Sequence, residues 1–92
     1  MKFIHIEGQD RGKVILYAIS TCIWCKKTKR LLNELGIAYD YIDVDLVSGE
    51  DKHEIQKEVL KWKERIGYPL IVINNKDCIP TFEPDKIREV LG

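Results

Sequence analysis

Residues 13–19 (KVILYAI) form a nearly continuous apolar run of strand length, and a helical pattern begins at residue 24, soon after it. A strand without polar alternation is typical of one that is covered on both faces, so we expect this run at the centre of a sheet. Over residues 24–35 the buried positions of an amphipathic helix recur every three or four residues, at Cys25, Thr28, Leu32 and Leu35. A central strand followed directly by a helix favours an α/β fold.

Cap signals mark both ends of this first helix. Ser20 or Thr21 suits the N-cap, and Gly36 suits a left-handed C-cap. Residues 38–46 (AYDYIDVDL) then alternate tyrosine and aliphatic side chains with aspartates, which predicts a second strand.

The second half of the chain predicts a helix, two strands and a final helix. Ser48 and Asp51 have the spacing of a capping box, and the apolar face of the helix that follows is predicted to run through Ile55, Val59, Trp62 and Ile66. The later elements are expected at residues 69–75 (PLIVINN), 77–82 (DCIPTF) and 83–92 (EPDKIREVLG). The predicted core order is therefore β-α-β-α-β-β-α.

Length and charge restrict the classes of function. A chain of 92 residues has the size of one domain, so we expect a single domain over residues 1–92. The formal net charge is zero, with 15 basic and 15 acidic residues, which does not favour a nucleic-acid partner. We find neither a signal-peptide pattern nor an apolar run of membrane-spanning length, and we expect a cytoplasmic monomer with no membrane partner.

Cys22 and Cys25 form a C-x-x-C pair at the junction of the first predicted strand and helix. Such a pair can be a redox couple, half of a metal site or two buried thiols. A cysteine at a helix N-terminus faces unpaired N–H groups and the positive end of the dipole, which favour the thiolate and indicate Cys22 as the nucleophile. Cys25 lies one turn further on the apolar face, where it suits a resolving role. Four basic residues in the same two turns create a positive potential that would attract an acidic partner. They are Lys26, Lys27, Lys29 and Arg30.

The element order and the position of the C-x-x-C pair resemble the thioredoxin superfamily and, more closely, the glutaredoxins. The resemblance covers residues 13–91, and the segments TCIWCKKTKRLLNELGI and FEPDKI are similar to small glutaredoxin-like redoxins, including those that supply electrons to ribonucleotide reductase. It implies a thioredoxin fold, with a four-stranded mixed core sheet flanked by three helices. It also implies a thiol–disulfide oxidoreductase without a tightly bound cofactor or metal.

The resemblance implies a dithiol mechanism and a substrate site. The Cys22 thiolate attacks a disulfide in a protein substrate, and Cys25 resolves the mixed disulfide that forms. Ribonucleotide reductase is among the expected protein substrates. Pro69 matches the cis-proline that the superfamily places opposite the cysteines, and Tyr68 would offer its backbone N–H and C=O to an extended substrate. The other expected substrate contacts are the neighbours of the cysteines, Thr21, Ile23 and Trp24.

Several positions depart from the glutaredoxin pattern. Ile23 stands where a proline is common, and Ile19 stands where a lysine usually precedes the cysteines. Ile79 and Pro80 take the approximate place of a Gly-Gly pair that lets glutathione approach the backbone. Two electron sources therefore remain open, namely glutathione and an NADPH-dependent flavoprotein disulfide reductase.

Residues 1–12 form an N-terminal extension that the resemblance does not explain. The segment KFIHIEG, residues 2–8, alternates apolar and polar side chains and suggests an added strand. In a thioredoxin fold the first core strand has neighbours on both sides, so a simple hairpin to residues 13–19 is excluded. We expect the segment at a sheet edge, with residues 8–12 (GQDRG) bridging the end of the sheet.

The main alternative function is iron–sulfur cluster binding, in which two chains would share a cluster through the same cysteines. An intrachain zinc site is a weak alternative, because Cys78, His5 and His53 have no second paired spacing. We interpret Cys78 as a packing residue in a predicted edge strand and Trp62 as a residue of the hydrophobic core. His53 is expected to be solvated.

Overall fold

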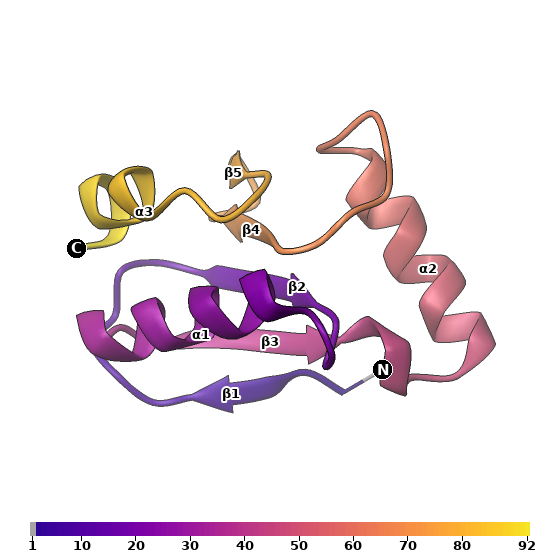
Figure 1. Ribbon diagram of the computed structural model, residues 1–92, viewed down its shortest axis with the longest axis horizontal. Helices are drawn as coiled ribbons and strands as arrows, with labels where there is room; N and C mark the ends of the chain where they lie inside the picture. Colours follow the sequence, from indigo (N-terminus) through magenta and orange to yellow (C-terminus); the bar gives the residue numbers. More distant parts are fainter. Residues whose placement is uncertain (1) are drawn as a thin grey trace.

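The computed structural model describes residues 2–92, in which five strands form one mixed sheet with helices on both faces (Figure 1). The strands are β1 (Ile4–Ile6), β2 (Val14–Ala18), β3 (Tyr39–Asp43), β4 (Leu70–Ile73) and β5 (Asp77–Ile79). The helices are α1 (Ile23–Leu35), the 3₁₀ turn η1 (Val44–Leu46), α2 (Gly49–Leu60) and α3 (Pro84–Leu91). The predicted order of the core elements and the thioredoxin fold are confirmed.

The strands lie in the order β1-β3-β2-β4-β5, so β2 is central, as its apolar sequence predicted. It pairs in parallel with β3 and antiparallel with β4. A parallel pair needs a crossover connection, and α1 supplies it. Because α1 starts at the carboxyl end of β2, the first turn of the helix lies at one end of the sheet (Figure 1).

The N-terminal segment forms an edge strand, as predicted. β1 runs antiparallel to β3, with Ile4 opposite Tyr41. The following residues cross the end of the sheet beside the α1–β3 turn, where the Gln9 N–H donates to the Gly36 carbonyl at 2.8 Å. Gly8 allows this close approach, because a Cβ atom there would lie 2.5 Å from the carbonyl carbon of Ile37.

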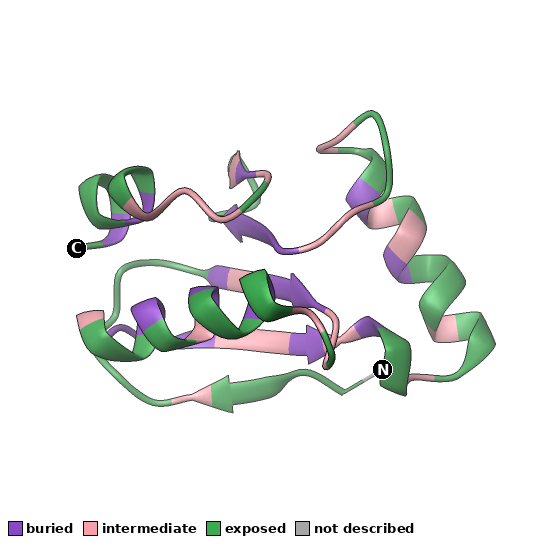
Figure 2. Ribbon diagram, in the orientation of Figure 1, coloured by how far each residue is buried: buried purple, intermediate pink, exposed green. Residues whose placement is uncertain are grey.

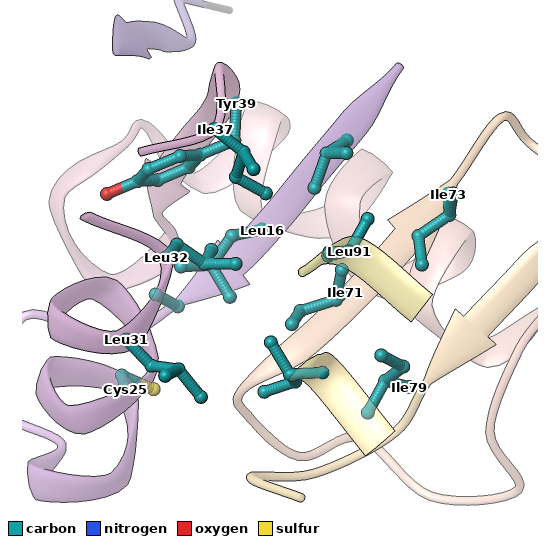
Figure 3. Close-up of a cluster of buried hydrophobic side chains, with 13 residues drawn as sticks. Leu16, Cys25, Leu31, Leu32, Ile37, Tyr39, Ile71, Ile73, Ile79 and Leu91 are labelled. Carbon is teal, nitrogen blue, oxygen red and sulfur yellow. The ribbon is translucent and has the colours of Figure 1, made fainter. Parts of the chain in front are cut away.

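The core has two halves, one on each face of the sheet. Alternate strand residues such as Leu16 and Ile71 pack with α1 and α3, and Leu32 of α1 is fully buried among them (Figure 3). Their neighbours in sequence, such as Tyr17 and Val72, face the other way and pack with α2. β4 is buried at every position, which explains its uninterrupted apolar sequence, whereas α2 is largely exposed (Figure 2).

The predicted ends of β3 and α2 differ from the structure. β3 ends at Asp43, because the next residues turn into η1 and bury Val44. α2 ends at Leu60, so Trp62 and Ile66 do not belong to its face. The chain leaves the helix through hydrogen bonds from the N–H groups of residues 62 and 63 to the Val59 carbonyl. Trp62 is half-buried against the α2 side of the core, and Ile66 is exposed.

Candidate active site

Cys22 is itself the N-cap of α1, in place of the predicted Ser20 or Thr21. Its backbone is extended, and its Sγ accepts a hydrogen bond from the Cys25 N–H at 3.2 Å. The Cys22 carbonyl accepts from the Lys26 N–H at 3.1 Å, which is the first helical bond. Cysteine is not among the usual N-cap residues, so the sequence predicted the cap at one of the two hydroxyl residues directly before it. The cap places the sulfur directly at the N–H groups of the first turn.

Cys25 lies one turn further along α1 and is completely buried. Its sulfur points toward the core between α1 and the sheet (Figure 3). Burial raises the pKa of the Cys25 thiol to about 12, and its hydrogen bond with Cys22 acts in the same direction. The backbone of Ile19 and the charge of Lys29 act in the opposite direction with smaller effects. Cys25 is therefore a neutral thiol at neutral pH, whereas Cys22 is the partly exposed sulfur of the pair.

We expect an alkylating reagent to distinguish the two thiols. In a Cys78→Ser background at pH 7, a short exposure to iodoacetamide should add one carbamidomethyl group, at Cys22, because the raised pKa and the burial of Cys25 suppress its thiolate. Reactivity at Cys25 should rise as the pH approaches 12. Peptide mapping by mass spectrometry measures both, and preferential labelling of Cys25 at pH 7 would contradict this assignment.

The loop before Cys22 is tied to η1. The Ser20 N–H and hydroxyl both donate to the Asp45 carboxylate, the N–H at 2.9 Å. These hydrogen bonds lower the pKa of Asp45, with the side-chain bond the larger cause. In addition, the Cys22 N–H donates to the Ile19 carbonyl at 3.1 Å. Cys22 thus stands at the end of a short loop that these hydrogen bonds hold to η1 and to itself.

The surface beside Cys22 is apolar. Ile23 and Trp24 expose 62% and 53% of their area, and Thr21 is also exposed. The Trp24 ring stacks on Phe82, with centroids 5.8 Å apart and an interplanar angle of 29°. The Lys27 ammonium also lies over the Trp24 ring, with its Nζ 4.6 Å from the ring centroid. Phe82 is a part of the site that sequence reasoning missed.

The basic residues of α1 do not share one role. The Lys29 ammonium lies 3.0 Å from an Asp43 carboxylate oxygen and 4.1 Å from the centre of the Tyr41 ring. Lys29 is therefore paired on the flank of the sheet, and its charge still lowers the pKa of Cys25. Its part in attracting an acidic partner stays a prediction. Lys26 and Arg30 are exposed, as is Lys27.

The peptide bond between Tyr68 and Pro69 is cis, as the sequence predicted. Pro69 is buried directly before β4, and Tyr68 packs against both halves of the core. The Tyr68 hydroxyl is buried without a hydrogen-bond partner. Burial raises its pKa, and so does its proximity to Cys25. The structure thus brings the segment before β4 close to the cysteine pair.

The other residues considered for a functional role lie apart from this site or belong to the hydrophobic core. Ile79 is buried in the core, whereas Pro80 and Cys78 are half-buried. His53 is exposed, and His5 contacts Asp40 at 2.7 Å on the β1–β3 edge. Within residues 2–92, no three His, Cys, Asp or Glu side chains are grouped in a way that could hold a metal ion. In the same residues no helix has the length and apolar character needed to cross a membrane.

Comparison with known proteins decides the family. Residues 14–78, from the start of β2 into β5, match the Glutaredoxin family. The chain belongs to the glutaredoxin family. Glutaredoxins are thiol–disulfide oxidoreductases, in agreement with the predicted class of activity. The matched region contains both cysteines of the C-x-x-C pair and the cis-proline.

The similarity extends to solved structures and curated glutaredoxins. The crystal structure of a glutaredoxin from Methanosarcina mazei Go1 is 43% identical with a TM-score of 0.92, covering 100% of this chain and 89% of that one. Methanoredoxin from Methanosarcina acetivorans is 42% identical with a TM-score of 0.89, covering 92% and 90%. Glutaredoxin 1 from Rickettsia conorii is 36% identical over 76 residues, which cover 79% of this chain and 72% of the relative. The chain spans 61% of the length of rice glutaredoxin-C6, which it also matches.

Proposed function

We propose that this glutaredoxin reduces protein disulfides with Cys22 as the attacking sulfur and Cys25 as the resolving one. The observation that carries the proposal is the asymmetry of the pair. Cys22 caps α1 at the surface and accepts the Cys25 N–H, whereas Cys25 is fully buried one turn away. A partly exposed sulfur at a helix N-terminus can react with a large substrate, whereas a fully buried sulfur can react only with Cys22.

The reaction proceeds in two exchanges. The Cys22 thiolate attacks one sulfur of the substrate disulfide, and the other substrate sulfur leaves as a thiolate. Cys25 then loses its proton and attacks the Cys22 sulfur, so that the bond between Cys22 and the substrate breaks. The substrate has gained two electrons, and the protein holds a Cys22–Cys25 disulfide. A reductant must then restore both thiols.

The exposed side chains around Cys22 would contact the substrate. An extended segment lying along the backbone of Tyr68 and Pro69 would meet Ile23 and Trp24, both more than half exposed. Ribonucleotide reductase is one candidate substrate of this kind, because the resemblance to ribonucleotide-reductase-linked redoxins covers the cysteine segment. The odd number of cysteines suits a reducing compartment, and we propose a cytoplasmic location.

We propose that a flavoprotein disulfide reductase, with NADPH as its electron source, resets the protein directly. A glutaredoxin from buckwheat, 28% identical with a TM-score of 0.65 over 83% of this chain and 64% of that one, has been solved as a glutathione complex. In this chain Ile79 fills core space, and Pro80 has no N–H to offer to a tripeptide. These two residues disfavour close binding of glutathione along the backbone after β5.

The test compares the two electron sources on one preparation. Freshly purified protein, handled without oxygen, is first examined for visible absorbance and for iron. It is then assayed for insulin reduction with two reducing systems, each supplied with NADPH. One contains glutathione and glutathione reductase, and the other contains thioredoxin reductase. We expect colourless protein that turns over with thioredoxin reductase. Turnover with the glutathione system but not with thioredoxin reductase would show that glutathione is the reductant, and the dithiol mechanism would still hold. Brown, iron-containing protein with little turnover would favour the cluster carrier instead.

A further inference from the structure

Lys63 lies in the segment between α2 and β4, and its ammonium group is turned toward the protein. Its Nζ donates to the Pro80 carbonyl at 2.7 Å and to the Gly67 carbonyl at 3.0 Å. Neither acceptor is a carboxylate, and burial lowers the pKa of Lys63. A charged donor held by two backbone carbonyls fixes the segments that carry them more firmly than a neutral donor would.

The two carbonyls belong to the two segments that border the cysteine pair. Gly67 directly precedes Tyr68 and the cis-proline, and Pro80 stands two residues before Phe82. Because Phe82 stacks on Trp24, the second segment is linked to one of the two residues between the cysteines. Lys63 thus joins the substrate-facing backbone of one segment to the aromatic neighbour of Cys22 in the other.

Lys63 also lies within electrostatic range of Cys78 and Cys25. Each of these interactions raises the pKa of Lys63, against the larger effect of burial. The other titratable groups that face Cys25 are Cys22 and Lys29 on α1 and Tyr68 before β4. Lys29, whose charge lowers the pKa of Cys25, is also paired with Asp43 at 3.0 Å, whereas the Lys63 ammonium is held by two backbone carbonyls.

We propose that Lys63 is a positioning residue for the resolving step. It aligns the segments at Gly67 and Pro80 around the mixed disulfide, and its positive charge favours loss of the Cys25 proton. The Cys25 thiolate then attacks the Cys22 sulfur, and the substrate sulfur leaves with the electron pair of the broken bond. This inference rests on the proposed function, because it assumes that Cys25 resolves a mixed disulfide on Cys22.

The experiment isolates the resolving step in a Cys78→Ser background. The mixed disulfide of Cys22 with thionitrobenzoate is formed at low pH, the pH is raised by rapid mixing, and release of thionitrobenzoate is followed from pH 6 to 10. Lys63→Gln keeps a donor but removes the charge, and Lys63→Arg keeps the charge. Lys61→Gln is the matched control, because Lys61 is exposed and pairs with Glu58 at 2.9 Å, away from the cysteines.

We expect Lys63→Gln to slow release about tenfold at neutral pH and to move the pH profile upward by about one pH unit. Lys63→Arg should stay within about threefold of the unchanged protein, and Lys61→Gln should match it. The initial attack of Cys22 on 5,5′-dithiobis(2-nitrobenzoate), measured in a Cys25→Ser background, should keep its rate and pH profile in Lys63→Gln.

Three outcomes would overturn the proposal: an unchanged release profile in Lys63→Gln, an equal loss in both steps, or a failure of Lys63→Arg to retain the rate while its thermal unfolding matches the parent. If Lys63→Gln does not fold, Lys63→Met and Lys63→Arg provide the same comparison of neutral and charged side chains. Absence of release from the parent protein itself would instead refute the proposed function, so the two failures are distinguishable.

Discussion

Replacing Cys22 with serine should abolish disulfide reduction, with a fall in turnover on the order of a thousandfold or more. The serine hydroxyl would occupy the same N-cap and accept the same Cys25 N–H, so the fold of α1 should persist. It would not be ionised at neutral pH, and it cannot form the mixed disulfide. The measurement is NADPH consumption coupled to insulin reduction, using whichever reductase supports the unchanged protein.

Cys78→Ser is the matched control for this change. Cys78 is a half-buried free thiol on β5, and its sulfur lies 4.0 Å from the Trp62 carbonyl, on the α2 side of the core. We expect the Cys78 variant to keep at least about half of the activity, because a thiol-to-hydroxyl change at a packing position costs little there. Full activity in Cys22→Ser would show that another group is the nucleophile.

Replacing Cys25 with serine should trap the enzyme on its substrate. The buried hydroxyl cannot displace the substrate from the Cys22 sulfur, so the first exchange proceeds and the second fails. After incubation with native insulin under nitrogen, most of the variant should carry the mass of one insulin molecule, and dithiothreitol should remove it. The unchanged protein should show little of this adduct, because Cys25 resolves it.

A double variant controls for adventitious disulfides. Cys22→Ser combined with Cys25→Ser retains Cys78 as its one thiol and should form no adduct. If Cys25→Ser reduced insulin at the rate of the unchanged protein without an external thiol, Cys25 would have no resolving role. An adduct of the same yield in the double variant would place the reactive thiol at Cys78.

Most of the fold could be predicted from local patterns. The apolar run that became β2 has no polar face, and this property alone placed it in the middle of the sheet. The spacing of Cys25, Thr28 and Leu32 gave α1 its buried face, and all three are buried. The alternation in residues 2–8 predicted β1, and the strand order implied by the thioredoxin fold placed it at a sheet edge.

The errors arose where a tertiary contact overrides a local signal. Trp62 and Ile66 continue the spacing of α2, yet the chain turns after Leu60 because it must reach the cis-proline and enter β4. Local spacing carries no information about that destination. The N-cap was misplaced for a related reason, since Ser20 donates to Asp45 of η1 and its side chain is not available to α1.

The parts of the site that sequence reasoning missed all depend on residues far apart in the chain. Phe82 reaches Trp24 because β5, antiparallel to β4, ends at the same end of the sheet at which α1 begins. Lys63 reaches the Pro80 carbonyl across a separation of 17 residues. No motif marks either contact. The C-x-x-C pair and the cis-proline could be identified because each has a fixed local spacing or a rigid backbone.

The central claim is that Cys22 and Cys25 form the redox couple, and the most direct test is the disulfide that a single turnover leaves behind. Reduced protein is mixed with an excess of native insulin without reductant, the remaining thiols are alkylated in denaturant, and the peptides are mapped by mass spectrometry. The proposed mechanism predicts a Cys22–Cys25 disulfide, loss of two hydrogens per chain, and an alkylated Cys78. A disulfide that includes Cys78, or three alkylated cysteines after insulin has been reduced, would contradict it.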